Sequence, residues 1–257
     1  MSVSVSVPVP VSVPEPDAVF GEPRLASIYD QLEPDRPDLK PYLSMVAEFG
    51  AHSVLDIGCG TGTFACLLAH HAIDVTGLDP AAASLAVAAR KPLAQRVRWF
   101  QGDTASLPPM QVDLVTMTGN VAQVFLTDDE WITMLSGARA RVRPGGRLVF
   151  EARDPSKAAW RLWDRAHTYR RVLLADAGSV ETWVDVTAVD LPLVSFRQTF
   201  VFEADGAVLV SDSTLRFRAQ TEIESALRIV GFDVEEVRGA ADRPGLELVF
   251  IARREVG

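Results

Sequence analysis

The chain contains few of the residues that usually mark metal or disulfide chemistry. Its 257 residues include two cysteines and four histidines. Cys59 and Cys66 are seven residues apart, about two turns of one expected helix, which is too far for a disulfide. Neither cysteine belongs to a spacing typical of a metal site. We therefore expect no metal, no disulfide and a cytoplasmic location, where thiols stay reduced.

An excess of positive charge and long apolar runs are also missing. Lysine and arginine number 25 against 34 acidic residues, for a net charge of −9. Such a chain is poorly suited to nucleic acid or anionic membrane surfaces. The arginines between positions 161 and 171 are interspersed with acids such as Asp164, which indicates a solvated helix face. No apolar run has transmembrane length, so we expect neither a nucleic-acid nor a membrane partner.

The first 17 residues alternate serine, valine and proline. Prolines at positions 8, 10, 14 and 16 remove backbone donors that a strand would need. The segment has no basic region of the kind that opens a secretory signal. We therefore predict a disordered tail over residues 1–17.

The most informative stretch runs from Val54 to Gly62. Its first four residues, Val-Leu-Asp-Ile, have buried-strand character, and glycines follow at positions 58, 60 and 62. The next segment, Thr63–Ala69, is apolar enough for a packed helix. A strand, a glycine-rich turn and a helix form the nucleotide-binding start of a doubly wound α/β domain. The glycines let the backbone approach a ligand, and the helix N-terminus offers free N–H groups.

The glycine spacing distinguishes two nucleotide classes. The dinucleotide fingerprint needs glycine or alanine at position 63, where this chain has Thr63. The spacing G-x-G-x-G, with Asp56 two residues before it, resembles the first motif of class I S-adenosylmethionine-dependent methyltransferases of the bacterial small-molecule type. That resemblance implies a Rossmann-like sheet of seven strands with the last strand antiparallel, and S-adenosylmethionine as cofactor. It assigns cofactor binding to Asp56, Gly58, Cys59, Gly60 and Gly62.

A second apolar run, Ile73–Leu78, ends at Asp79 and Pro80. Asp79 lies 21 positions after Gly58. In a doubly wound domain the end of the second strand lies beside the first loop, where a carboxylate accepts hydrogen bonds from a ribose diol. We therefore predict that Asp79 and Pro80 contact the cofactor. The alternative is a surface turn, which Asp-Pro sequences favour.

The third and fourth strands, expected at 97–101 and 112–117, are each followed by polar residues. The resemblance implies that Asp103, with Thr104, contacts the adenine; a loop-capping aspartate is the alternative. After the fourth strand come Gly119 and Asn120, at the end of the sheet where ligands bind. Base-modifying amino-methyltransferases usually have two prolines and an aromatic residue after this Asn, but the chain reads Asn-Val-Ala-Gln, which argues against base methylation. Asn120 and Gln123 are candidates for contact with the methionine end or the substrate, and Asn120 is equally suited to capping a helix.

The remaining segments complete the predicted domains. Residues 18–50 are expected to form a helical lid, in which Tyr29 either faces the ligand or packs on the sheet. The Rossmann-like domain covers 51–155 and 219–257, with a fifth strand at 147–152 and an antiparallel final pair at 232–238 and 246–252. Capping boxes at Thr127 and Thr221 predict the starts of two helices.

The inserted segment, residues 156–218, has two parts. Residues 156–175 read as helical from their spaced tryptophans, leucines and valine. Alternating apolar residues then predict antiparallel strands at 183–187, 194–202 and 208–217, with Asp205-Gly206 in a hairpin turn. We interpret this inserted antiparallel sheet as a substrate cap or as the surface of a homodimer.

The resemblance implies methyl transfer by in-line displacement to a nitrogen, oxygen or carbon nucleophile of a small molecule. The alternatives are a protein that binds the cofactor without methyl transfer, and a nicotinamide oxidoreductase, which Thr63 disfavours. A general base is needed only if the nucleophile is protonated and poorly acidic, and a neutral amine needs none at the attack step. His52, His70 and His71 fall at the wrong edge of the sheet, so only His167 is a candidate on the ligand side, and a surface position is the alternative. We assign no catalytic residue.

Overall fold

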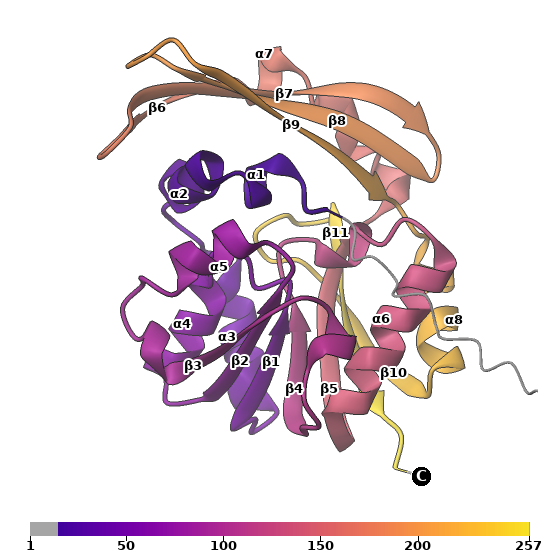
Figure 1. Ribbon diagram of the computed structural model, residues 1–257. Helices are drawn as coiled ribbons and strands as arrows, with labels where there is room; N and C mark the ends of the chain where they lie inside the picture. The colour runs from indigo at the N-terminus through magenta and orange to yellow at the C-terminus, as the bar shows by residue number, and fades with distance from the viewer. Residues whose placement is uncertain (1–14, 257) are drawn as a thin grey trace, which may run out of the picture.

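The computed structural model of the protein describes residues 15–256, so residues 1–14 of the predicted tail lie outside the described residues. Two sheets form, one of seven strands and one of four (Figure 1). The seven-stranded sheet contains β1 Ser53–Ile57, β2 Asp74–Asp79, β3 Val97–Gln101, β4 Val112–Met117, β5 Val142–Arg153, β10 Phe232–Gly239 and β11 Glu247–Arg254.

The strand order is β3-β2-β1-β4-β5-β11-β10. The first five strands pair in parallel, and β11 is antiparallel to both β5 and β10. This order confirms the predicted Rossmann-like sheet with its antiparallel last strand. Because the order reverses between β1 and β4, a crevice is expected at the carboxyl ends of these two strands.

Helices cover both faces of this sheet. The helices α3 (Leu39–Glu48) and α4 (Thr63–His70) share one apolar cluster with Val54 of β1. Neighbouring side chains of a strand point to opposite faces. Leu55 accordingly joins a second cluster, which α6 and α8 cover on the other face.

The starts of α6 (Asp128–Arg141) and α8 (Gln220–Ile229) differ in how well the sequence predicts them. At α6 the capping box is confirmed, since Thr127 and Glu130 exchange hydrogen bonds of 2.9 and 3.2 Å. At α8 the prediction is wrong by two residues. The helix begins after Ala219, whose N–H donates to Glu222 at 2.7 Å, so Glu222 occupies the third helical position.

The inserted segment forms a cap above the carboxyl ends of the main sheet (Figure 1). Its elements are η4 Pro155–Lys157, η5 Ala159–Leu162, α7 Arg165–Thr168, β6 Arg170–Leu174, β7 Gly178–Asp190, β8 Leu193–Phe202 and β9 Val208–Arg216. The strands pair antiparallel in sequence order, and Gly206 (φ 71°) lies in the β8–β9 turn, which confirms the predicted hairpin.

The predicted helix over 156–175 is wrong. Only short helical turns form up to Thr168, and residues 170–174 make the edge strand β6, paired with β7. A strand sends successive side chains to opposite faces. Leu174 is therefore buried against the lid while Leu173 is 84% exposed. A short apolar run fits the period of a helix as well as that of a strand. Here the pairing with β7 makes the run a strand. Dimerisation through this sheet stays a prediction.

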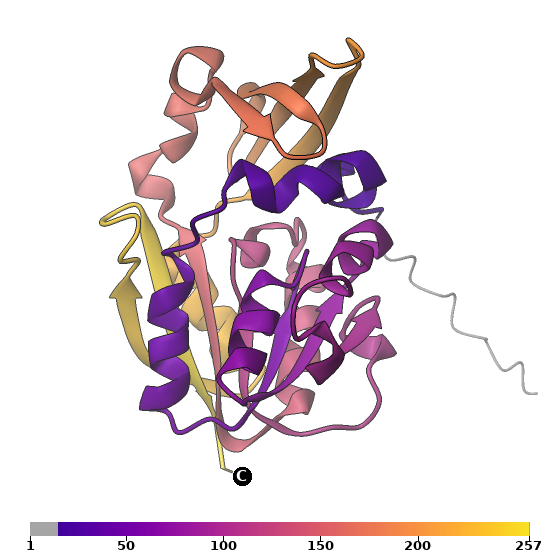
Figure 2. The same ribbon diagram turned by 90° about the vertical axis from the view of Figure 1, so that its left-hand side faces the viewer.

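The N-terminal lid lies between the two sheets (Figure 2). It consists of α1 (Ala18–Gly21) and α2 (Pro23–Leu32), whose apolar side chains pack against β6, β7 and β8. On the other side, the Ser84 hydroxyl of α5 (Ala82–Ala88) donates to the Phe20 carbonyl at 2.9 Å. The short turns η1 Ala94–Arg96, η2 Thr104–Ser106 and η3 Val121–Gln123 follow in the loops of the main domain.

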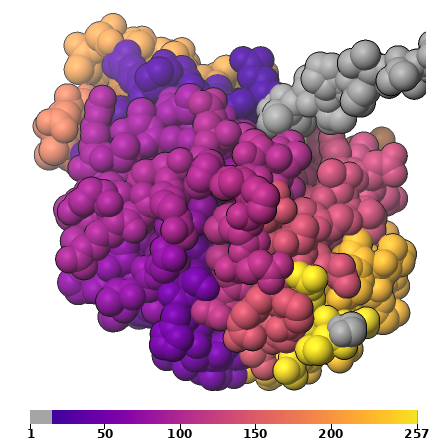
Figure 3. All heavy atoms as spheres, turned by 60° about the horizontal axis from the view of Figure 1, so that its bottom comes forward, coloured from indigo at the N-terminus to yellow at the C-terminus, as the bar shows by residue number. Residues whose placement is uncertain are grey.

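The amino ends of the strands lie at the opposite end of the molecule from the cap. There the C-terminal residues, in yellow, lie against the pink residues of the α6–β5 region (Figure 3). Arg254 joins the two segments by donating to the carbonyl of Arg139 at 2.9 Å. Among the helices of residues 15–256, none has the length and apolar character needed to cross a bilayer.

Gly137 in α6 tests this packing. An ideal Cβ there would lie 2.5 Å from the Cβ of Thr104 and closer still to its hydroxyl. Helix propensity alone favours alanine by about 1 kcal/mol, but overpacking costs about 1–3 kcal/mol. We expect Gly137→Ala to lower the unfolding free energy measured in urea, whereas Ser136→Ala on the exposed face of α6 leaves it nearly unchanged. A Gly137→Ala protein as stable as the wild type would contradict this packing.

Candidate functional site

The glycine-rich turn connects β1 to α4 with positive φ at all three glycines: 69° at Gly58, 53° at Gly60 and 77° at Gly62. A Cβ on Gly58 would meet Val121 at 2.5 Å, and one on Gly62 would meet Trp99 at 2.5 Å. A Cβ on Gly60 would meet nothing within 4 Å. Packing thus restricts the outer two positions, while the backbone at Gly60 faces open space.

Asp79 ends β2 beside this turn. Its carboxylate accepts one hydrogen bond from the N–H of Gly60 and one from the N–H of Ala81, both at 2.8 Å. Burial raises the pKa of Asp79, and these two backbone donors oppose the rise. Each oxygen keeps lone pairs for a further donor. Pro80 follows, and its carbonyl accepts a hydrogen bond from Gln101 at 3.3 Å.

Asp56 and Cys59 are the buried ionisable groups of the motif. One oxygen of Asp56 accepts a hydrogen bond from the Thr116 hydroxyl at 2.9 Å, and the other has no partner among residues 15–256. Burial raises the pKa of Asp56 to about 7, although the Thr116 hydrogen bond lowers it. Burial also raises the pKa of the Cys59 thiol well above its usual range. Cys59 is therefore an unreactive thiol at neutral pH.

The loop after β4 holds Gly119 (φ 77°) and Asn120 (φ 63°). A Cβ on Gly119 would meet nothing within 4 Å, so this backbone also faces open space. The N–H of Asn120 donates to Glu151 at 2.7 Å, and its amide donates to Glu247 at 3.2 Å. The Asn120 side chain makes no capping bond to η3, so it does not adopt the capping alternative.

Asp103 and Thr104 lie at the end of β3. Asp103 is exposed, and its carboxylate accepts hydrogen bonds from the N–H groups of Ala105 (2.9 Å) and Ser106 (3.2 Å). It therefore caps η2, as the alternative interpretation has it. Thr104 is buried against Gly137. Their contact with the adenine stays a prediction.

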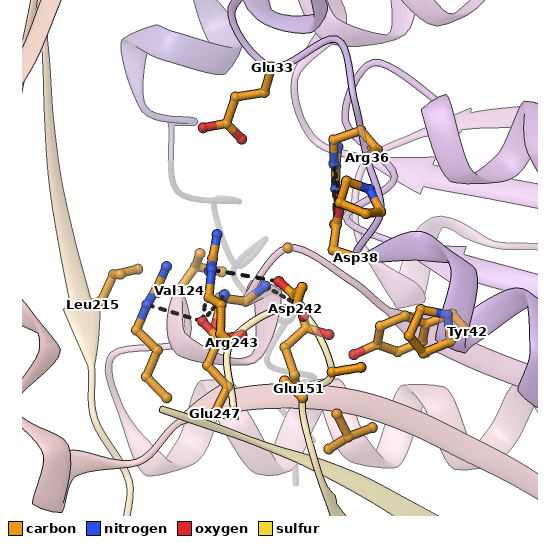
Figure 4. Close-up of a pocket in the computed structure, with 18 of the residues that line it drawn as sticks. Glu33, Arg36, Asp38, Tyr42, Val124, Glu151, Leu215, Asp242, Arg243 and Glu247 are labelled. Atoms are coloured by element: carbon orange, nitrogen blue, oxygen red, sulfur yellow. Dashed lines mark hydrogen bonds and ion pairs between the residues drawn. The ribbon is translucent and has the colours of Figure 1, made fainter. Parts of the chain in front are cut away.

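A cavity of about 720 Å³ opens between the lid, the cap sheet and the ends of β4, β5, β10 and β11. Three sequence-predicted residues line it: Tyr29, Gly119 and Asn120. Figure 4 shows Glu151 of β5 near Glu247 of β11 on one wall, with Tyr42 of α3 to one side, while charged residues of the segment after α2 lie across the cavity: Glu33, Arg36 and Asp38. None of these wall residues was predicted from the sequence.

The predicted cofactor residues at the ends of β1, β2 and β3 do not line this cavity, and neither do two of the three substrate and lid candidates. Gln123 is 1% exposed, and its side chain bridges Arg153 at 3.0 Å and the Arg216 carbonyl at 3.4 Å. It therefore supports the wall from behind. His167 lies in α7 with its Nδ1 2.9 Å from the Asp164 carboxylate, and both side chains are about half exposed. The cap points this histidine into solvent instead of toward the cavity.

Comparisons with known proteins agree with this geometry. The model of a methyltransferase domain family matches residues 54–146. The cypemycin N-terminal methyltransferase of a Streptomyces species is 25% identical over 226 residues, covering 83% of this chain and 90% of the relative. A putative methyltransferase of a Geobacillus species is 30% identical over 138 residues, covering 50% of this chain and 56% of its own.

Solved structures extend the likeness to nearly the whole chain. The CcbJ methyltransferase of Streptomyces caelestis superposes with a TM-score of 0.74 at 22% identity, covering 90% of this chain and 96% of its own. A sugar N-methyltransferase of a Streptoalloteichus species gives 0.73 at 19% identity, covering 100% and 99%. At these identities the structures establish the fold alone. Residues 54–146 therefore match a methyltransferase domain, and the fold over nearly the whole chain is one that S-adenosylmethionine-dependent methyltransferases adopt.

A polar network joins the lid to the glycine-rich loop of this methyltransferase. Asp30 of α2 accepts hydrogen bonds from the hydroxyls of Thr61 (2.6 Å) and Thr63 (3.1 Å). Lys91 forms an ion pair with Asp30 at 2.7 Å and also donates to Thr63 at 2.6 Å. The lid helix is therefore fixed to the nucleotide loop by a charged and partly buried contact. In the sequence, the two threonines on either side of Gly62 are the feature that could have indicated a polar contact at this loop.

Among residues 15–256, no group of three or more His, Cys, Asp or Glu side chains is arranged to hold a metal ion.

The Asp30 network predicts how firmly the lid is held. A hydrogen bond to a charged group contributes about 1.5–3 kcal/mol, so Asp30→Ala should raise the amide hydrogen-exchange rates of α2 by about tenfold or more. Asp30→Asn, which keeps an acceptor for the threonines, should have a smaller effect. The exposed Arg24–Asp205 pair also joins α2 to the cap. Since exposed pairs contribute little, Asp205→Ala serves as the control; equal exchange in the Asp30 and Asp205 variants would contradict the assignment.

Asp56 predicts a pH effect on stability. Its folded pKa is raised to about 7, so relative to the unfolded chain the group favours folding below about pH 4 and loses that contribution as pH rises through about 7. The unfolding free energy of Asp56→Asn minus that of the wild type should therefore rise between these pH values in urea titrations.

Asp113 predicts a pH effect on stability of the opposite sign. Burial raises its pKa, but Arg143, His52 and Ser53 outweigh that effect and lower it to about 2. Asp113→Asn should therefore be less stable than the wild type at neutral pH, and the difference should shrink below about pH 4.

For the first of these two variants, Asp56→Asn, a difference from the wild type that does not change with pH would refute the buried, proton-retaining Asp56.

Proposed function

We propose that the protein transfers the methyl group of S-adenosylmethionine to a nitrogen, oxygen or carbon nucleophile of a small molecule bound in the cavity. The observation that carries this proposal is the position of the cavity. It begins at Gly119 and Asn120, at the carboxyl end of β4, next to the strand-order reversal where open α/β sheets bind ligands.

The residues around that reversal fit the cofactor. Gly60 and Gly119 leave open space beside their backbones, as a closely held ligand requires. Asp79 has unused lone pairs for a ribose diol, and Asp103 with Thr104 lies at the end of the next strand for the adenine. The cofactor, when bound, supplies an electrophilic methyl group on a sulfonium.

The chain's own contribution is enclosure and positioning. The lid and the cap sheet cover the cavity, which excludes water and holds a nucleophile near the cofactor. Its volume of about 720 Å³ lies within the range typical of small-ligand sites. An acceptor of that size is a small molecule or the end of a chain.

The named relatives point to the same class of acceptor. One solved structure with TM-score 0.68 is an amino pentose methyltransferase involved in calicheamicin biosynthesis, and another is a sugar N-methyltransferase. The cypemycin relative is an N-terminal methyltransferase. These names favour nitrogen as the acceptor atom.

Calorimetric titration with S-adenosylmethionine, S-adenosylhomocysteine and NADH tests the cofactor. We expect both sulfur compounds to bind and NADH not to bind. Release of S-adenosylhomocysteine in the presence of small amines, phenols and acids then separates a methyltransferase from a protein that only binds the cofactor. Binding of neither sulfur compound would overturn the proposal.

Asp79 provides a sharper test of the site. Loss of a charged acceptor to a buried diol costs about 1.5–3 kcal/mol, so Asp79→Ala should weaken S-adenosylhomocysteine binding by about ten- to a hundredfold. Asp74→Asn changes a carboxylate at the exposed other end of β2 and should bind normally.

A 2′-deoxy analogue of S-adenosylhomocysteine separates a ribose contact from a role in loop shape. The wild type should bind this analogue more weakly than the parent compound, and Asp79→Ala should scarcely distinguish the two. Equal discrimination by both proteins would show that Asp79 only shapes the Gly60 turn.

A further inference from the structure

Glu151 is a buried carboxylate in the wall of the acceptor cavity. It lies near the end of β5 and is 5% exposed. One oxygen accepts the hydrogen bond from the Asn120 N–H at 2.7 Å. The other oxygen has no donor among residues 15–256. A buried carboxylate oxygen without a donor is costly, so a ligand that supplies an N–H or O–H group fits this position.

The neighbouring arginines do not neutralise Glu151. Arg243 pairs with Glu247 at 2.7 Å, and Arg153 lies 3.5 Å from the same carboxylate. Arg153 also donates to Gln123 at 3.0 Å. Glu247 thus takes both cations, and Glu151 forms no ion pair within 4 Å among the residues that the structure describes.

The rest of the cavity wall is also acidic. Eight carboxylates face four arginines, an excess of four acids: Asp17, Glu33, Asp35, Asp38, Glu48, Glu151, Asp242 and Glu247 against Arg36, Arg153, Arg238 and Arg243. Each arginine already has an acidic partner in the wall, such as Asp38 for Arg36 and Glu48 for Arg238. An anionic acceptor would find no free cation there, whereas a cationic acceptor is favoured.

Two further buried oxygens of the wall have no hydrogen-bond partner within the part of the chain that the structure describes. They are the Tyr42 hydroxyl and the side-chain oxygen of Asn120, each on a side chain about 95% buried. With the free oxygen of Glu151 they make three hydrogen-bond acceptors along one cavity. A primary ammonium has three N–H donors and no acceptor.

We propose that the methyl acceptor is an organic ammonium ion, a primary or secondary amine in its protonated form, and that Glu151 binds it and takes its proton. This inference rests on the proposed methyl transfer. A protonated amine has no lone pair, so it cannot attack a methyl group until it loses a proton.

The free oxygen of Glu151 receives one proton from the ammonium and becomes a neutral carboxylic acid, leaving a neutral amine. The nitrogen lone pair forms the new N–C bond while the C–S bond breaks. The electron pair of the broken C–S bond stays on sulfur. The products are a methylated ammonium and S-adenosylhomocysteine, and Glu151 later releases its proton to water.

The surroundings of Glu151 suit this exchange. Burial raises its pKa to about 7, although the hydrogen bond from the Asn120 N–H lowers it; the charge of Glu247 raises it and that of Arg153 lowers it. A carboxyl group with a pKa near neutrality can both accept and release a proton at the operating pH.

Calorimetry on protein saturated with S-adenosylhomocysteine tests the proposal with matched probes. Benzylamine is a cation at neutral pH, benzyl alcohol is its neutral counterpart, and benzoate is an anion. We expect benzylamine to bind about tenfold more tightly than the alcohol, as a charge-assisted bond to a buried carboxylate would give, and benzoate to bind more weakly than either. Below about pH 7 the benzylamine affinity should fall by up to about tenfold per pH unit as Glu151 becomes protonated, while that of the alcohol stays constant.

Glu151→Gln keeps the shape and an acceptor for the Asn120 N–H. We expect it to lose the preference for benzylamine over benzyl alcohol. Glu235→Gln removes the same charge from a surface pair with Arg147 outside the cavity and should keep the preference. If Glu151→Gln does not fold, the selectivity and pH dependence of the wild type still decide the question.

Three results would overturn the inference: equal affinity for amine and alcohol, an undiminished preference in folded Glu151→Gln, or no amine binding at millimolar concentration. The same titration separates it from the proposed function. Failure of S-adenosylhomocysteine to bind removes both, whereas normal binding without amine selectivity removes only the role of Glu151.

Discussion

The carboxylate of Asp30 connects the parts of the molecule that make the site. It accepts hydrogen bonds from the threonines beside Gly62, and Lys91 balances its charge. Through it the lid helix α2 is held against the glycine-rich loop, while the other side of the same helix packs under the cap sheet. The lid thus fills the space between the glycine-rich loop and the cap sheet, and the cap sheet also contacts the main domain directly, where Arg216 of β9 pairs with Asp128 at 2.8 Å.

Local sequence was sufficient to predict the cofactor half of the molecule. The strand, glycine turn and helix around Gly60, and Asp79 at the end of the next strand, are each set by residues within a few positions of one another. The Rossmann-like sheet that the family resemblance implied was confirmed. The errors arose where one local pattern served two structures: Thr221 has a glutamate three residues on, but Glu222 reaches back to Ala219, and an edge-strand pairing overrode the helical spacing near Leu173.

The acceptor half was not predictable because its parts are distant in sequence. Glu151 comes from β5, Asn120 from the loop after β4, Glu247 from β11 and Tyr42 from α3. In the sequence Glu151 is one acid within an apolar strand, with nothing to show that its neighbour in space is an asparagine 31 residues earlier. Only the register of β4 and β5 brings the two together. Asn120 was predicted as a site residue from its position after the fourth strand. Its hydrogen bond to Glu151 could be found only in the structure.

Asp56 and Glu151 are two buried carboxylates in similar surroundings that differ in their access to the cavity. Each has one oxygen bonded and one without a partner among residues 15–256, and burial raises the pKa of both to about 7. Asp56 is 1% exposed and does not line the cavity, so we expect its titration to act on stability, while its contact with the cofactor stays a prediction. Glu151 lies on a cavity wall, so the same physical state becomes available to a bound molecule. The difference between a structural and a chemical carboxylate here is access, which the lid and the cap sheet determine.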